Sequence, residues 1–224
     1  MLGFNFNTPL EKYKCGEQDV WVKRDDLLNG DLDLPPWAKM EGIRQILESD
    51  HMDKSRPILH LSIRVSYSGW ALAYIGRELG YDIKVAYPDS KNYPQEALEK
   101  IKSFGAEIIP VRPNLLDIVT TYTKRVAEEN DYQMMPYAFN HPIYINYFSD
   151  RMKEVIKEND FDNLVINAGS GVTGSGMDWL ETSFPCNGNW DKKAWYWLER
   201  NKLEGKTLFW NLGGKVLDSC LKSS

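Results

Sequence analysis

The chain has 224 residues, a formal net charge of -5 and 42% hydrophobic residues. This is enough apolar material for the core of one large domain or two small ones. The negative charge balance and the lack of a long basic run argue against a nucleic-acid partner without ruling one out, and they do not indicate binding to an anionic membrane.

No stretch reaches the roughly 18 to 20 consecutive apolar residues that span a bilayer, and the first seven residues lack the pattern of a secretion signal. We therefore expect a cytoplasmic protein. The three cysteines have no Cys-x-x-Cys spacing, and the three histidines form no zinc motif, so free thiols and no bound metal are expected.

Along the chain, the first part predicts a short strand within residues 19–26 and a loop over residues 27–36, which contains Asn, Gly, Asp and two prolines. Apolar residues at helical spacing begin at Trp37. Lys39 is thus expected at the start of a helix that directly follows a loop.

From residue 57 onward, apolar strands alternate with amphipathic helices. Strands are predicted over residues 58–63, 82–87, 106–111, 132–138, 164–167 and 207–210, and helices over residues 69–79, 94–104, 115–129 and 143–157. Repeated strand and helix units predict an α/β fold, with a parallel sheet covered by helices on both faces. Ligands of such sheets bind beyond the carboxyl ends of the strands.

A glycine-dense turn, Asn-Ala-Gly-Ser-Gly-Val-Thr-Gly-Ser-Gly-Met, follows the strand predicted at residues 164–167. Its backbone N–H groups, together with a helix starting near Thr173, would form a phosphate site. The spacing Gly169-x-Gly171-x-x-Gly174 also matches a dinucleotide fingerprint, but no strand with an acidic residue follows about 20 residues later. A P-loop is excluded because Ser, not Lys, follows Gly174. A single phosphate on a small cofactor fits best, and a connection that binds nothing remains the alternative.

Several ordered segments extend this interpretation. They are Thr-Pro-Leu-Glu at 8–11, Val-Lys-Arg-Asp-Asp-Leu at 22–27, Lys-Met-Glu-Gly at 39–42, Ser-Tyr-Ser-Gly-Trp-Ala-Leu-Ala-Tyr at 66–74, Phe-Gly-Ala-Glu at 104–107, Gly-Ser-Gly-Val-Thr at 169–173 and Leu-Phe-Trp-Asn-Leu-Gly-Gly at 208–214. In this order they resemble the fold-type II pyridoxal-phosphate-dependent enzymes, the tryptophan synthase β-like superfamily. Within it the chain is most similar to 1-aminocyclopropane-1-carboxylate deaminase and D-cysteine desulfhydrase, in a shortened form.

The resemblance implies pyridoxal 5'-phosphate as cofactor and gives roles to individual residues. Lys39 matches the lysine that forms the internal aldimine, and Ser66 matches a serine close to the substrate. Tyr67 stands where most members have an asparagine on the phenolic oxygen of the cofactor. The implied catalytic residues are Lys39, Ser66 and Tyr67, and the implied cofactor-binding residues are Lys39, Tyr67, Ser68, Gly169, Ser170, Gly171, Val172 and Thr173. For Ser66 and Ser68, a purely structural role as caps of the following helix is an equal alternative.

The sequence departs from the family pattern in three places. Tyr67 replaces the asparagine, Leu212 replaces a threonine near the pyridine nitrogen, and the chain lacks about a hundred residues that members commonly have. The stretch before the last strand is instead rich in tryptophan, which suits either a subunit interface or a core. The resemblance implies a larger cofactor-holding domain of residues 1–50 and 140–224, a smaller α/β domain of residues 51–139 and a homodimer.

The expected activity is a lyase or deaminase reaction on an amino acid or an amino-acid-like group. One alternative is a compact tailoring enzyme, for example one that decarboxylates an amino-acid group on a modified nucleobase. Another is a catalytically weakened protein that still binds the cofactor. The fold does not distinguish these reactions.

Overall fold

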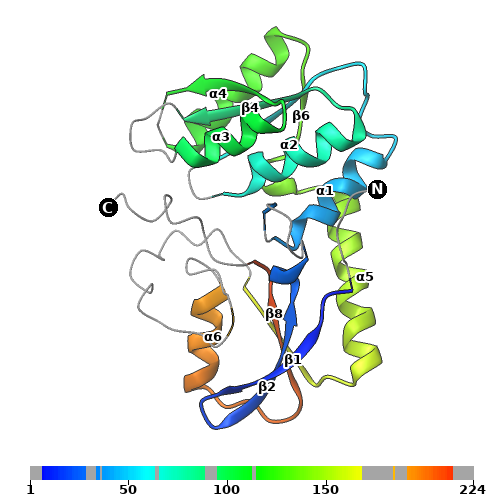
Figure 1. Ribbon diagram of the computed structural model, residues 1–224, viewed down its shortest axis with the longest axis vertical. Helices are drawn as coiled ribbons and strands as arrows, with labels where there is room; N and C mark the ends of the chain where they lie inside the picture. Colours follow the sequence, from blue (N-terminus) through cyan, green and yellow to red (C-terminus); the bar gives the residue numbers. More distant parts are fainter. Residues whose placement is uncertain are drawn as a thin grey trace. The chain divides into compact units, whose positions relative to one another are not determined.

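The computed structural model describes residues 7–28, 34–35, 37–63, 66–88, 95–112, 115–167, 184 and 191–213. The chain divides into two compact units (Figure 1). Unit 1 contains Gly3–Lys39 and Phe148–Val216, and unit 2 contains Met40–Tyr147. Which of them holds the cofactor stays a prediction.

The sheet of unit 1 has the order β1-β2-β8-β7. Its strands are β1 (Leu10–Cys15), β2 (Gln18–Arg24), β7 (Asn163–Ile166) and β8 (Thr207–Asn211). β8 is parallel to both of its neighbours, but β1 pairs with β2 in an antiparallel hairpin. The sequence did not predict β1, because this edge strand alternates lysines with few apolar residues and so has a weak apolar pattern.

Helices cover both faces of this sheet (Figure 1). On one face, α6 (Asp191–Arg200) packs Trp195 and Leu198 against Phe209 of β8. On the other face, α5 (Pro142–Asn159) packs against Leu208 and Trp210. Successive side chains of a strand point to opposite faces, which is why consecutive residues of β8 contact different helices.

The tryptophan-rich segment includes a helix for which the sequence analysis made no prediction. Its described part includes α6, in which Trp195 belongs to the core, and Trp210 in β8 is fully buried. The helix was missed because its apolar positions are few and the aromatic residues dominate the pattern.

The sheet of unit 2 is entirely parallel, with the order β5-β4-β3-β6. Its strands are β3 (Ile58–Leu61), β4 (Ile83–Pro88), β5 (Glu107–Val111) and β6 (Gln133–Met134). The helices are α2 (Ser68–Leu79), α3 (Gln95–Ser103) and α4 (Leu116–Glu129), and α1 (Lys39–Glu48) begins at the last residue of the first segment of unit 1.

Helices also pack on both faces of the unit 2 sheet. Val119 and Ala127 of α4 contact Ala86 of β4. A side chain at Gly76 of α2 would instead meet Ile83 of the same strand. Residues 83 and 86 differ by an odd number and therefore face opposite sides of the sheet. The predicted α/β class with helices on both faces is confirmed.

The predicted strand over residues 132–138 is wrong in its second half. β6 ends at Met134, and a 3-10 helix, η2, follows at Tyr137–Phe139. Pro136 lacks an N–H group for a further ladder bond, and Ala138 has a φ of 54°, which no strand allows. In the part of the chain that is described, no helix is long and apolar enough to cross a membrane.

Candidate active site

Lys39 lies at the carboxyl edge of the unit 1 sheet. The N–H group of Ala38 donates to the carbonyl oxygen of Leu212 at 2.8 Å, and Trp37 forms an isolated bridge with Gly213. Both partners directly follow β8. The first residue of α1 is thus held where a strand of a parallel sheet ends, the place where ligands of such sheets bind.

The ammonium group of Lys39 is largely withdrawn from water. Burial lowers its pKa, and the nearby carboxylate of Asp191 acts in the opposite direction. Its Nζ atom lies 5.2 Å from the centre of the Trp37 ring. Desolvation disfavours the charged form of an amine, so Lys39 loses its proton more readily than a surface lysine and becomes a better nucleophile.

Asp191 is a second functional candidate, which the sequence analysis missed. It is the first residue of α6 and is only 1% exposed. Burial raises its pKa to about 8, the charge of Asp26 raises it further, and the backbone at Gly213 and Leu212 and the charge of Lys39 lower it. At neutral pH this carboxyl group is mostly protonated. Sequence alone offered no signal, because an aspartate at a helix start is most simply an N-terminal cap.

A network of charged and polar side chains lies at this edge of the sheet. Nε and Nη2 of Arg24 donate to the two carboxylate oxygens of Asp26 at 2.8 and 2.7 Å, and Nδ2 of Asn211 donates to Asp26 at 2.8 Å. The network joins the ends of β2 and β8. The amide N–H group of Asn211 is thus engaged with Asp26. The side chain of Leu212 offers no donor.

Asp25, the neighbour of Asp26, is fully buried and has a structural role. It accepts hydrogen bonds from Thr8 Oγ1 at 2.5 Å, from Arg151 Nη2 at 2.9 Å and from Trp210 Nε1 at 2.7 Å. Three segments far apart in the sequence meet at this carboxylate. The charged motif at residues 22–27 therefore organises the sheet edge.

The predicted phosphate loop, Gly169, Ser170, Gly171, Val172 and Thr173, lies outside the described residues. The chain reaches it from β7, whose last residue, Ile166, pairs with Trp210 of β8. β7 thus ends at the carboxyl edge that also carries Lys39. Its role as a phosphate cup stays a prediction.

Ser66, Tyr67 and Ser68 lie in unit 2, at the start of α2, whereas Lys39 belongs to unit 1. Ser66 Oγ accepts from the N–H group of Ser68 at 3.1 Å, from the position directly before the N-cap residue Tyr67. Ser62, which the sequence analysis did not single out, accepts from the N–H group of Gly69 at 3.2 Å. Tyr67 is buried beside Trp70. These contacts are local, and the roles of Ser66, Tyr67 and Ser68 at the cofactor stay predictions.

Comparison with known proteins identifies the family. The model of the family described as pyridoxal-phosphate dependent enzyme matches residues 66–178, half of the chain. This chain belongs to that family. Its cofactor is therefore pyridoxal 5'-phosphate, and the predicted fold-type II class is confirmed.

Individual relatives are more distant. A glycyl-dTMP PLP-dependent decarboxylase of Pseudomonas phage M6 is 23% identical over 283 residues, covering 92% of this chain and 98% of that protein. The structure of an ACC deaminase homologue superimposes with a TM-score of 0.71 at 17% identity, over 95% of this chain and 90% of the homologue. A pyridoxal 5'-phosphate-dependent aspartate racemase gives a TM-score of 0.59 at 18% identity, over 90% of this chain but only 56% of the racemase. At these identities the two structures show a shared fold.

The residues at the unit 1 edge fit this cofactor. The aldehyde requires an amine that can lose its proton, and Lys39 is desolvated and held beside a buried acid. Asp191 is buried at this same edge, where the backbone of Leu212 and Gly213 lowers its pKa. Among the residues that the structure describes, no group of three or more His, Cys, Asp or Glu side chains could hold a metal ion.

Proposed function

We propose that this chain is a pyridoxal-phosphate-dependent decarboxylase that acts on an amino-acid group carried by a pyrimidine nucleotide. One observation carries the proposal: the chain is similar to the phage decarboxylase over 92% of its own length and 98% of the length of that enzyme. The alignment of 283 positions is longer than this chain, so the relative has segments that this chain lacks. The shortened build is compatible with the same chemistry if the sheet edge around Lys39 is retained.

In this proposal Lys39 Nζ binds the aldehyde of the cofactor, and the backbone N–H groups of residues 169–173 hold its phosphate. Burial lowers the pKa of both Lys39 and Lys23, but Nζ of Lys23 donates to the carbonyl oxygen of Thr8, so Lys39 is favoured. The neutral amine is the form that attacks an aldehyde. Asp191, mostly protonated at neutral pH, can release a proton near it.

When bound, pyridoxal phosphate withdraws electrons from the α-carbon of the substrate. It thereby stabilises the electron pair that stays on this carbon when one of its bonds breaks. In decarboxylation the broken bond joins the α-carbon to the carboxylate, carbon dioxide leaves, and the α-carbon gains one proton. Lys39 Nζ, once the substrate amine has displaced it, is the group that can deliver this proton. Asp191 can then return a proton to Lys39.

The deaminase-like members of the family are a less suitable guide to the reaction. Tyr67 and Leu212 occupy positions that the resemblance assigns to an asparagine and a threonine in those enzymes. The buried phenol of Tyr67 is larger than an amide, and the side chain of Leu212 cannot form a hydrogen bond. A reaction other than deamination is therefore favoured, although the lyase and deaminase reactions remain the competing outcome.

The test is to incubate the purified protein and pyridoxal phosphate with glycyl-dTMP and, separately, with free glycine, D-cysteine and 1-aminocyclopropane-1-carboxylate. We expect carbon dioxide from the nucleotide-linked group and none from the free amino acids. Ammonia or sulfide released from a free amino acid would assign the chain to the lyases or deaminases. Cofactor binding with no product from any substrate would leave only a cofactor-binding role.

A further inference from the structure

All three histidines of the chain lie in unit 2, at one short turn. The turn, residues 137–143, follows β6 and leads into α5. The ring of His60 in β3 stacks on the ring of Phe139, with 4.9 Å between the ring centres and 13° between the planes. The ring of His141, within the turn, meets the ring of His51 edge-on at 5.2 Å. Histidine is the side chain whose ordinary pKa lies between pH 5 and 8, so these contacts place a change of charge at this turn.

The backbone of the turn is strained. Ala138 and Phe139 have φ values of 54° and 58°, in the left-handed region that residues with a side chain rarely adopt. Such residues persist only where surrounding contacts hold them. Here Phe139 stacks on His60 and also on Tyr144, at 6.3 Å, and its N–H group donates to the carbonyl oxygen of Pro136 at 2.9 Å. Packing therefore keeps the turn closed.

The closed turn requires a neutral His60. Its side chain is buried, and this burial lowers its pKa to about 4, while the backbone of Met135 acts in the opposite direction. Among the described residues, no charged side chain contributes to this shift. The phenols of Tyr137 and Tyr144 stay neutral in acid, because burial raises the pKa of both. A protonated ring would thus be a buried charge without an acid to pair with it.

His141 adds a second effect at the start of α5. It directly precedes Pro142, the first residue of the helix, and its Nδ1 atom accepts a hydrogen bond from the N–H group of Ile143 at 3.3 Å. Protonation of Nδ1 removes this acceptor and places a positive charge at the positive end of the helix dipole. Burial and the charge of His51 both lower the pKa of His141, whereas the acids near His51 in its loop, at positions 50 and 53, do not contribute.

We propose that the turn of residues 137–143 is a pH-sensitive switch, which is closed while His60 and His141 are neutral and which opens as they bind protons in mild acid. In the open turn the rings reach water. The inference is independent of the proposed reaction. α5 begins at this turn and continues into unit 1, where its Arg151 binds Asp25. The switch therefore acts on the first turn of a helix that both units share.

The test is hydrogen exchange of the full chain at pH 7 and pH 5, followed by mass spectrometry and corrected for the intrinsic rate at each pH. The N–H groups of residues 139, 140 and 145 are hydrogen-bonded in the closed turn. The pKa of His60 is about 4 in the closed turn and about 6.5 in water, so the opening constant should rise about 20-fold from pH 7 to pH 5.

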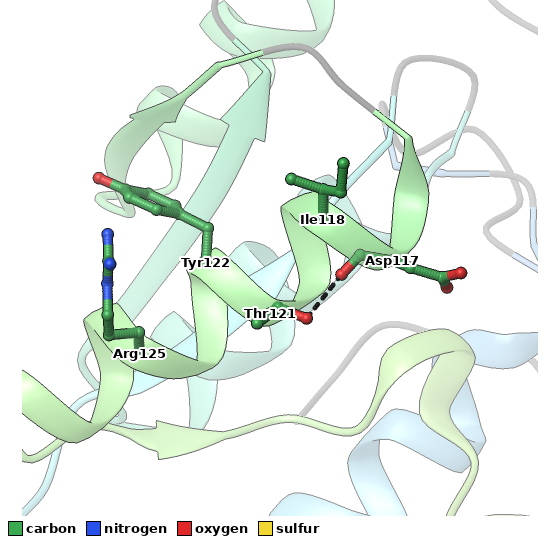
Figure 2. Close-up of a pocket in the computed structure, with 5 residues that line it drawn as sticks. All are labelled: Asp117, Ile118, Thr121, Tyr122 and Arg125. Atoms are coloured by element: carbon green, nitrogen blue, oxygen red, sulfur yellow. Dashed lines mark hydrogen bonds between the residues drawn. The ribbon is translucent and has the colours of Figure 1, made fainter.

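Helix α4 of the same unit is the internal reference. It contains no histidine, and its exposed side carries Asp117 and Arg125, with Thr121 Oγ1 donating to the carbonyl oxygen of Asp117 at 2.8 Å (Figure 2). At pH 5 the turn should exchange at least about tenfold faster than the buried side of α4, because it opens without unfolding of the unit. Equal protection of the two at pH 5 would mean that acid unfolds the whole unit, and this would overturn the proposal.

Two variants remove the titration. His60→Phe keeps an aromatic ring on Phe139 without binding a proton, and His141→Asn keeps an acceptor at the helix start. Each should reduce the rise between pH 7 and pH 5, and the double variant should abolish it. His141→Asn lies outside the core, so the test does not depend on tolerance of His60→Phe. A double variant that keeps the full rise would overturn the proposal.

A third variant separates the strain from the titration. Ala138→Gly adopts the positive φ without cost, so it should slow opening of the turn by the same factor at both pH values and leave the pH dependence intact. Lys102→Gln is the control, because it removes an exposed positive charge from α3 of the same unit, and it should behave as the wild type. Wild-type protection of the turn that does not differ between pH 7 and pH 5 would also overturn the proposal.

Discussion

At the scale of single residues, the candidate site contains two side chains, Lys39 and Asp191, whose pKa values are shifted toward each other. Burial lowers the pKa of Lys39 and raises that of Asp191 to about 8. Both shifts have the same cause, because low-dielectric surroundings disfavour either charge. Each group also acts on the other, because the charge of Asp191 raises the pKa of Lys39 and the charge of Lys39 lowers that of Asp191. Opposed shifts of this kind are frequent at catalytic sites.

Lys39→Ala should abolish the covalent link to the cofactor and reduce turnover by at least about 10³-fold, since the attacking amine is lost. The visible absorption of the bound cofactor should disappear, and borohydride should no longer attach the cofactor to the peptide that contains residue 39. Lys202→Ala, at an exposed position in the same unit, is the control and should keep both signals. Label retained in Lys39→Ala would move the cofactor site to another lysine.

Asp191→Asn should change the pH dependence of stability of the cofactor-free chain. The pKa of Asp191 is about 8 in the folded state and about 3.9 in an unfolded chain, so between these values the folded state binds the additional proton. Folding stability then decreases as pH rises from about 4 to about 8. The variant lacks this loss, so its melting temperature relative to wild type should be higher at pH 8 than at pH 5. A difference that is the same at both pH values would mean that Asp191 ionises normally.

At the scale of the elements, the buried carboxylate of Asp25 holds the edge of the unit 1 sheet together. It connects η1 (Asp25–Leu27) to β8 through Trp210, to α5 through Arg151 and to the segment before β1 through Thr8. Because the contacts come from four parts of the chain, this network fixes the strand ends that also position Lys39.

Asp25→Ala should destabilise the fold by about 3 to 5 kcal/mol, because it leaves the mostly buried charge of Arg151 without its carboxylate partner. Chemical denaturation measures the loss. Asp19→Ala, which removes an exposed acid paired with Lys12 and Lys14, should change stability little. Equal effects of the two substitutions would contradict a special role for the buried network.

The contact between α2 and β4 has no room for a side chain at residue 76. A Cβ atom at Gly76 would lie 2.6 Å from Cδ1 of Ile83. Gly76→Ala should therefore destabilise by about 1 to 3 kcal/mol, although alanine normally favours a helix. Adding Ile83→Ala makes space for the new methyl group, so the two costs should be less than additive in a double-mutant cycle. Strict additivity would show that the two residues do not press on each other.

At the scale of the whole molecule, the two units differ in how the chain builds them. The described residues of unit 2 all come from one stretch of the chain, Met40–Tyr147, which has its own four-stranded sheet and apolar cluster. Unit 1 is assembled from two segments that meet at β2 and β8. A continuous segment with its own core can fold without the remainder of the chain.

The fragment of residues 40–147 should therefore fold when expressed alone and melt cooperatively, as followed by circular dichroism. The fragment of residues 1–39 should stay unfolded, since its β2 lacks the pairing with β8. A disordered 40–147 fragment would mean that unit 2 depends on unit 1 for its stability.

The sequence by itself determined the alternation of strands and helices, the α/β class and the cofactor. Apolar periodicity and glycine placement are local signals, and the ordered motifs from residue 8 to residue 214 carried the family. The sequence also selected Lys39, through the motif Lys-Met-Glu-Gly at residues 39–42. Whether the lysine and the glycine loop jointly hold the cofactor stays a prediction, because residues 169–173 lie outside the described part of the chain.

Only the tertiary structure decided which distant side chains meet. Asp191 is 152 positions from Lys39, yet the pairing of Trp37 with Gly213 and the start of α6 bring both to one sheet edge. The sequence likewise did not reveal the hairpin of β1 and β2, the division into two sheets or the buried hydrogen bonds of Asp25. Strand order and burial arise from contacts between segments that are remote in the sequence. A pKa shift such as that of Asp191 depends on burial, which no local pattern encodes for a lone acid.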